Sequence, residues 1–316
     1  MDKDSATRSY MQNPKHFADA INGYFFSGQQ IVKPDHLREL DTAEFKHDEG
    51  MKKYRDILKE AVIMEDDRMT FAIFGIEAQS AVHYAMPVRN FIYDALRYDR
   101  QLQEIRDRHK EDKDLRGDEY TSGISKTDKL KPVVTLTIYF GARPWDGPRT
   151  LKAMLNYPEI LDPYINDYDI NLLAPLEVED FEVFQTEFRK VLKLITSLKS
   201  KEDLYAASRH VEYNNMSKET NRFVTIITGG KIKFKKKGEQ TIMFPAFEEI
   251  KEDGIKIGEV RGETRGEARG EARGLVRGVE NFAKISEVSI EVACHAYGCT
   301  MQEYKAAKAL LASQSA

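Results

Sequence analysis

The sequence predicts a mixed α/β fold followed by a mainly helical C-terminal region. Two β-branched and apolar runs, at residues 54–64 and 70–76, form a candidate hairpin across a short charged connection. A long amphipathic pattern at 86–108 precedes a strand-like run at 133–140. Strands that alternate with helical patterns in this way are typical of a sheet flanked by helices.

The composition limits the classes of function. Apolar residues make up 41% of the 316 residues, which is enough for a sizeable core and allows about two domains. Lys and Arg number 48 against 52 Asp and Glu. The resulting net charge of −4 argues against a polybasic DNA-coating protein. It does not exclude an enzyme whose own metal site is acidic.

The chain is expected to be cytoplasmic. No apolar run approaches the roughly 20 residues that a membrane span needs, and the charged residues 1–9 are unlike a secretory signal. Cys294 and Cys299 are the only cysteines, and their scarcity fits a reducing compartment. The chain has no H-E-x-x-H or C-x-x-C spacing and no P-loop, so neither a structural zinc site nor ATP-driven chemistry is indicated.

Taken in order, the first expected element is a helix at 16–26, because Ala18, Ile21 and Phe25 share one face. Residues 37–40 are ambiguous and stand where a first strand would fall. The helix expected at 86–108 starts near Pro87, which a first turn tolerates. Its core-facing stripe is predicted to be apolar: Val88, Phe91, Ile92, Ala95, Leu96, Leu102 and Ile105.

Beyond this helix, the charged residues 106–131 are expected to form a solvated loop or insertion. Residues 133–140 are apolar on both faces, which predicts a buried strand. The region 150–250 has a mainly helical pattern, with one strand expected at 169–173 and the clearest helix at 185–198.

A glycine repeat follows. Glycines recur at every fourth position, at 254, 258, 262, 266, 270, 274 and 278. The segment is either a flexible linker or a helix, and the Arg and Glu residues between the glycines favour the helix. On a helix the glycines form a ridge that a second copy could approach closely, which predicts a homo-oligomer. Residues 281–297, Gly298 and 301–311 predict helix, turn and helix, an element for protein interaction rather than DNA reading because few basic residues occur there.

We therefore divide the chain into four parts: a core at 1–175, a helical extension with a basic segment at 176–250, the glycine repeat at 251–279 and a C-terminal segment at 280–316.

The hairpin predicts a pair of opposed carboxylates. With a two-residue turn at Asp66 and Asp67, Asp56 would stand directly opposite Glu77. Opposed side chains lie on one face with Cβ atoms roughly 4.5–5.5 Å apart, so two carboxylates repel unless a positive group lies between them. A divalent cation with oxygen ligands would serve. Gln79 projects to the same face as Glu77, and the Ala78 carbonyl offers a further oxygen.

The alternative is that these acids simply face solvent, as acids at strand ends commonly do. Glu77 argues against it, because it ends a run, residues 71–76, that is apolar on both faces and is therefore expected to be central in its sheet. An acid at the end of a buried strand needs a partner.

Three segments resemble the Rpn family of recombination-promoting nucleases, also described as transposase-like, within the PD-(D/E)XK nuclease superfamily. They are Phe-Gly-Ile-Glu-Ala-Gln-Ser at 74–80, His-Tyr-Ala-Met-Pro-Val-Arg-Asn at 83–90, and Tyr-Phe-Gly at 139–141 with Pro-Trp-Asp-Gly-Pro at 144–148. The resemblance covers most of residues 1–250, and a glycine-repeat tail is compatible with it.

The resemblance implies a Mg²⁺-dependent DNA endonuclease with a PD-(D/E)XK core of helix, three strands, helix and strand. Asp56 then corresponds to the metal-binding aspartate and Glu77 to the second acid, with the Ala78 carbonyl as a further metal ligand. Gln79 stands where the superfamily usually has lysine. A glutamine can orient a water molecule by hydrogen bonding but supplies no charge, so the metal would have to lower the pKa of the water and stabilise the charge that develops on phosphate.

Other residues have two interpretations each. Asp4 and Asp19 are additional acids that either contact the metal or, the more ordinary case, are solvated. Arg89 and Arg97 either reach phosphate or are solvated helix charges. The basic run at 231–237 either binds the DNA backbone or forms a solvated strand or loop.

Two rival functions remain open at this point. The first is a DNA-binding or protein-interaction protein that keeps the nuclease fold without turnover. The second is a true transposase with a ribonuclease-H-like site, which would require a third essential carboxylate far downstream, and no such residue stands out.

Overall fold

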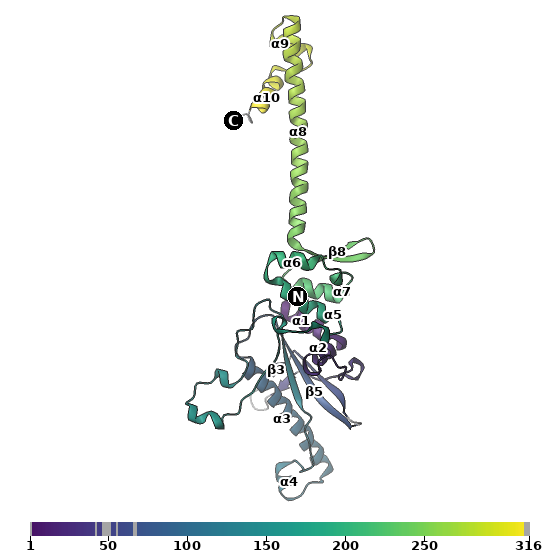
Figure 1. Cartoon of the computed structure of the whole chain (residues 1–316), viewed down its shortest axis with the longest axis vertical. Coiled ribbons are helices and arrows are strands. Elements are labelled where there is room, and N and C mark those ends of the chain that lie inside the picture. Colours follow the sequence, from purple (N-terminus) through teal and green to yellow (C-terminus); the bar gives the residue numbers. More distant parts are fainter. Residues whose placement is uncertain (1, 42, 46–51, 55, 66–67, 313–316) are drawn as a thin grey trace. The chain divides into compact units, whose positions relative to one another are not determined.

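The structure is a computed structural model that describes residues 2–41, 43–45, 52–54, 56–65 and 68–312. The chain divides into two compact units, Met1–Ala246 and Phe247–Ala316, and both are drawn in Figure 1. In the described part of the chain, no helix combines the length and the apolar character that a membrane crossing requires.

A five-stranded mixed sheet forms the centre of the first unit, which confirms the predicted α/β class. Its strands, in spatial order, are β1 (Arg38–Glu39), β4 (Ile57–Glu65), β5 (Arg68–Gln79), β6 (Val133–Tyr139) and β7 (Asn171–Leu173). The β1–β4 and β4–β5 pairs are antiparallel, whereas β5–β6 and β6–β7 are parallel. β5 is therefore an interior strand with neighbours on both edges.

The predicted register of the hairpin is confirmed. Glu65 pairs with Arg68 and Ile57 pairs with Ile76, as a two-residue connection requires. The connecting residues, Asp66 and Asp67, lie outside the described residues. Because side chains alternate along a strand, this register also fixes which residues of β4 and β5 share a face.

One face of the sheet packs against helices that come from the start and from the later part of the first unit. These are α1 (Lys3–Gln12), α2 (Pro14–Phe26), α5 (Glu187–Thr196) and α7 (Lys218–Ile227). The even-numbered residues of β5 from Ala72 to Ala78 join the same apolar core as Phe17 and Phe188. The helix expected at 16–26 is thus confirmed as α2, while α1 was not predicted because its sequence is polar on most of its circumference.

The opposite face of the sheet carries α3 (Met86–Asp112), which contacts β6. The helix is confirmed, but the predicted apolar stripe is wrong. Phe91 is 46% exposed, and the residues that α3 buries are mostly polar: Asn90, Tyr93, Asp94, Arg97, Gln101 and His109 together with Met86 and Pro87. Polar groups can be buried in this way where they find hydrogen-bond partners, and the sheet supplies them.

The loop expected at 106–131 is only partly a loop. α3 continues to Asp112, and a short helix, α4 (Gly117–Ser122), follows it. Figure 1 shows α4 at the C-terminal end of α3. The ambiguous segment at 37–40 contributes β1, a strand of only two residues.

The region 150–250 contains more than helices. β7 confirms the strand expected at 169–173, and α5 confirms the helix expected at 185–198. Between β6 and α5 the helical turns are 3₁₀, and after α6 (Lys201–Ser208) and α7 the chain forms a second hairpin, β8 (Ile232–Lys237) and β9 (Gln240–Pro245). A further short pair, β2 (Ala43–Phe45) and β3 (Lys52–Tyr54), lies outside the main sheet.

The second unit confirms the helical alternative for the glycine repeat. The repeat lies within α8 (Ala246–Ser286), and α9 (Ile290–Ala296) and α10 (Met301–Ala312) follow. A small core joins the end of α8 to both helices through Val279, Cys294 and Tyr304. The helix expected at 281–297 is broken, because Glu287 adopts a left-handed conformation (φ 50°) and Ser289 caps α9.

Candidate functional site

Asp56 lies in a bend immediately before β4 and is held from two sides. Its Oδ2 accepts a hydrogen bond from the backbone N–H of Ala78 (2.9 Å), and its Oδ1 accepts one from Nη2 of Arg8 (3.0 Å). The Asp56 side chain is 12% exposed, and that of Arg8 is 52% exposed. The sequence predicted that Asp56 would stand in the strand ladder, directly opposite Glu77. Asp56 instead lies just before the ladder begins, but its carboxylate reaches the neighbouring strand beside Glu77.

Glu77 is fully buried near the end of β5, where it stands beside Thr137 of β6. Its Oε2 lies 3.0 Å from Nη2 of Arg89, in the first turn of α3. The guanidinium-bearing side chain of Arg89 is 29% exposed. The expectation that Glu77 needs a partner is met by this arginine, so Arg89 is not a free solvated charge.

Ala78 and Gln79 complete the predicted set. In a strand the N–H and C=O of one residue point to the same edge, so the Ala78 carbonyl points to the edge on which Asp56 contacts the Ala78 N–H. Gln79 is the last residue of β5 and is partly exposed; its carbonyl accepts a hydrogen bond from the N–H of Phe140 (2.8 Å). Its side chain shares a face with Glu77.

The charges of the site balance. Two carboxylates, Asp56 and Glu77, face two guanidinium groups, Arg8 and Arg89. Burial alone would lower the pKa of Arg89. The negative charges of the Glu77 and Asp56 carboxylates oppose burial, and the pKa of Arg89 is raised above its ordinary value. Burial raises the pKa of the Tyr93 phenol, and the negative charge of Glu77 adds to the effect. The arginine therefore stays charged and the phenol stays neutral.

The donor set fits Mg²⁺ in its chemistry. Mg²⁺ commonly takes one or two carboxylates and keeps several water molecules, which two acids and one carbonyl oxygen can satisfy. Among the side chains that the structure describes, no group of three or more His, Cys, Asp and Glu is positioned around one point. Water or substrate phosphate would supply the remaining ligands, and the half-exposed Arg8 is the charge that a cation would replace.

The two additional acids behave differently. Ser80, just beyond β5, donates a hydrogen bond to Oδ1 of Asp4 (2.9 Å), so α1 brings Asp4 and Arg8 to the same end of the sheet. Asp19 is buried and accepts hydrogen bonds from the N–H groups of Gln185 (2.7 Å) and Thr186 (2.9 Å). Both interpretations of Asp19 are wrong, since it neither joins the site nor is solvated; it fixes the start of α5.

The polar face of α3 extends from the site along β6. Asn90 Nδ2 donates to Thr137 Oγ1 (2.9 Å), and Thr135 Oγ1 donates to Asp94 Oδ1 (2.6 Å). Gln101 pairs through its side-chain amide with the backbone of Lys131, accepting at 2.8 Å and donating at 3.1 Å. The sequence did carry a signal for this face, because residues 90, 94, 97 and 101 repeat at helical spacing.

Arg97 also lies on this buried face, so its prediction as a solvated charge is wrong. The basic run at 231–237 falls on β8 and the residue before it, with its five lysines exposed, in agreement with the solvated-strand interpretation. Binding of the DNA backbone by this run stays a prediction.

No protein-family model matches this chain, and neither a curated protein nor a solved structure matches it.

Proposed function

We propose that the chain is a Mg²⁺-dependent DNA endonuclease with a PD-(D/E)XK-like core. The observation that carries the proposal is the junction at Ala78, where the Asp56 carboxylate bonds the backbone of the strand whose preceding residue is the buried Glu77. One acid just before β4 and one near the end of β5 thus lie at the same end of the hairpin. The order of helix, strands β1, β4 and β5, helix α3 and strand β6 supports the proposal.

In this proposal Asp56, Glu77 and the Ala78 carbonyl hold Mg²⁺. The bound ion would lower the pKa of a water molecule and stabilise charge on the phosphodiester. The Gln79 amide orients that water through a hydrogen bond. The oxygen of that water would form a bond to phosphorus as the P–O bond to the leaving strand breaks, and the proton that the water gives up would pass through solvent to the leaving oxygen. Arg89 orients the Glu77 carboxylate through their ion pair, and Arg8, which is half exposed, would withdraw from Asp56.

The experiment is a plasmid-nicking assay with and without Mg²⁺. Asp56→Asn and Glu77→Gln keep the shape of each side chain and remove its charge, so we expect both to lose at least about a hundredfold in rate. Asp35→Asn changes an exposed acid on another segment and is the matched control. Circular dichroism checks that each variant is folded. Cleavage by folded Asp56→Asn at the parent rate would refute the assignment.

A non-cleaving protein that retains the fold is the second candidate. It is favoured by the two ion pairs, because Arg8 and Arg89 neutralise both acids without any metal. The nicking assay separates the candidates, and calorimetry with Mg²⁺ or Mn²⁺ shows whether the site binds the ion. Binding of the ion that Asp56→Asn abolishes, with no cleavage of any DNA form, would favour this candidate over the enzyme.

We also propose that α8 mediates self-association and that the protein is cytoplasmic. Cys294 and Cys299 are both free thiols, which suits a reducing compartment. At the glycines of α8 at 258, 262, 266, 270 and 274, nothing beyond the neighbouring residues and the helix's own backbone lies within 4 Å of the point that a Cβ would occupy, so this ridge is open to a second copy.

A further inference from the structure

A cavity of about 810 Å³ lies between the last turns of α3 and the short helix α4. Every Lys, Arg, Asp or Glu that lines it is basic: Arg106, Lys110, Lys113 and Arg116. His109 lines it as well. The surrounding stretch, residues 104–119, contains seven Asp and Glu against five Lys and Arg. The basic lining therefore arises because four basic side chains of this segment border the cavity and its acidic side chains do not. It does not follow from the composition of the segment.

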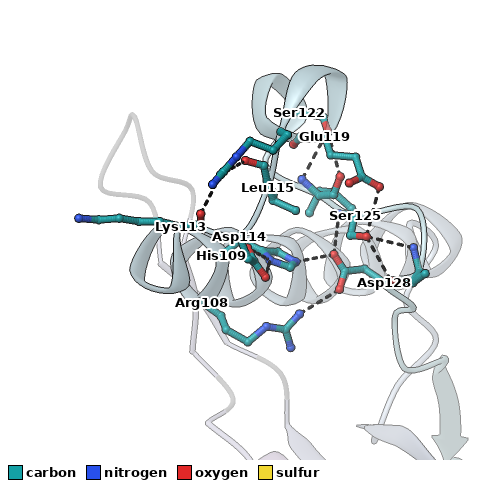
Figure 2. A network of polar contacts seen from close by, with 12 residues as sticks. Arg108, His109, Lys113, Asp114, Leu115, Glu119, Ser122, Ser125 and Asp128 are labelled. Carbon is teal, nitrogen blue, oxygen red and sulfur yellow. Dashed lines mark hydrogen bonds and ion pairs between the residues drawn. The ribbon is translucent and has the colours of Figure 1, made fainter.

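Three nearby acids, Asp114, Asp128 and Glu119, form hydrogen bonds within the protein and do not line the cavity. Asp114 Oδ1 lies 2.7 Å from Nδ1 of His109, and Asp128 Oδ2 lies 2.8 Å from Nε2, as Figure 2 shows. An ionised carboxylate only accepts, so carboxylates at both ring nitrogens favour the protonated ring, in which both nitrogens donate. These two hydrogen bonds raise the pKa of His109 above its ordinary value. Glu119 accepts from the N–H of Lys126 (2.9 Å).

The walls of the cavity are fixed by hydrogen bonds within the protein. Arg116 Nη1 donates to the carbonyls of Lys113 (2.8 Å) and Leu115 (2.7 Å). Asp128 accepts from Arg108 Nη2 (2.9 Å) and from the N–H of Ser125 (2.8 Å), which ties the loop after α4 back to α3 (Figure 2). A site ordered in advance loses little conformational entropy when a ligand binds.

An exposed aromatic ring completes the lining. Tyr120 of α4 borders the cavity and is 75% exposed. Cations that follow a backbone of phosphates, together with an exposed aromatic ring on which a base can stack, are the usual means of holding single-stranded nucleic acid. Duplex DNA keeps its bases stacked inside and offers no such contact.

We propose that this cavity binds a single strand of nucleic acid, with Arg106, Lys110 and Lys113 on its phosphates and a base stacked on Tyr120. His109 is 20 residues beyond Arg89 on α3, which places the cavity about 30 Å from Glu77 along the helix. The cavity is thus a site apart from the carboxylates. The proposal shares the nucleic-acid ligand of the proposed function and does not require hydrolysis.

The test is fluorescence anisotropy of the full chain with a labelled oligothymidylate, in EDTA so that cleavage cannot contribute. Each phosphate contact adds about 0.7 to the slope of log K against log salt for a single strand. The variant Lys110→Gln/Lys113→Gln should therefore lower the slope by about 1.4. Tyr120→Ala should weaken binding about tenfold or more with the slope unchanged, and Tyr120→Phe should restore the affinity.

The control, Lys15→Gln/Lys201→Gln, removes two exposed lysines elsewhere and should leave the slope at the parent value. The proposal is overturned if the parent does not bind the oligonucleotide at low salt, or if both lysine variants shift the slope equally. It is also overturned if Tyr120→Ala binds as the parent does. Loss of nicking activity has no bearing on these readouts, so the two proposals fail separately.

Discussion

Arg89 and Glu77 form an ion pair of 3.0 Å in which the carboxylate is fully buried and the guanidinium reaches partly into solvent. The pair joins α3 to the interior strand of the sheet at the proposed catalytic end. A buried carboxylate that loses its cation keeps the cost of desolvation without the compensating attraction.

Arg89→Met should accordingly destabilise the protein by about 3–5 kcal/mol. Urea unfolding followed by circular dichroism measures the change. The double variant Glu77→Gln/Arg89→Met should recover part of the loss, because no unpaired charge is then buried. Equal stabilities for Arg89→Met and the parent would show that the pair contributes nothing.

The proposed role of Gln79 gives a second prediction. Gln79→Ala removes the amide that orients the water, and we expect nicking to fall by about 10²-fold, within the usual range for a positioned proton-transfer or orienting group. Gln79→Lys supplies a charge beside the nucleophile and should retain more activity than Gln79→Ala. Asn would be too short, so Gln79→Asn should resemble the alanine variant. Nicking at the parent rate by all three variants would exclude a role for this side chain.

His109 gives a prediction about pH. Its pKa is raised in the folded protein by Asp128 and Asp114, so its contribution to stability is complete below about pH 6.5, the unfolded value, and is lost as pH rises through the folded pKa. NMR titration of the ring should give a pKa above 6.5, and Asp114→Asn should lower it. The unfolding free energy of the parent should fall over this range more steeply than that of His109→Gln.

Two glycines in helices should respond oppositely to alanine. A Cβ at Gly23 in α2 would lie 2.2 Å from Cε1 of Phe184, so Gly23→Ala should cost about 1–3 kcal/mol through overpacking. At Gly266 in α8 nothing beyond the neighbouring residues and the helix's own backbone lies within 4 Å of that position, and alanine should favour the helix by about 1 kcal/mol. Thermal unfolding of each variant distinguishes the two cases.

Self-association through α8 can be tested with the same position. Its Glu residues at 259, 263, 267 and 271 lie one turn apart, and like charges at this spacing repel. A second copy could offset them with its Arg residues. If the glycine ridge is the contact, Gly266→Ala together with Gly270→Ala should weaken association in sedimentation velocity while raising helicity. Unchanged association, or a monomeric parent at all concentrations, would contradict this proposal.

Much of the sheet could be predicted from local chemistry. A two-residue connection fixes the β4–β5 register, and the apolar run before Glu77 requires burial on both faces, so one hairpin determined the neighbourhood of Asp56 and Glu77. The pairing of Arg8 with Asp56 could not be foreseen, because Arg8 is 48 residues from Asp56 in sequence and reaches it only through the packing of α1.

The buried face of α3 shows a second limit. An apolar stripe normally marks the face that packs, and Phe91 belongs to such a stripe, yet Asn90 and Asp94 lie against the sheet because Thr137 and Thr135 offer them partners. Burial of a polar face depends on complementary groups in another element, and periodicity within one helix does not reveal them.

That polar face also has a mechanical consequence. Two apolar surfaces can shift slightly against each other at little cost, whereas hydrogen bonds depend on direction and distance. A shift of α3 by one turn would break three contacts at once: Asn90–Thr137, Asp94–Thr135 and Gln101–Lys131. These hydrogen bonds therefore fix the position of α3 along the sheet, so the cavity at the C-terminal end of α3 is held at a set distance from Glu77.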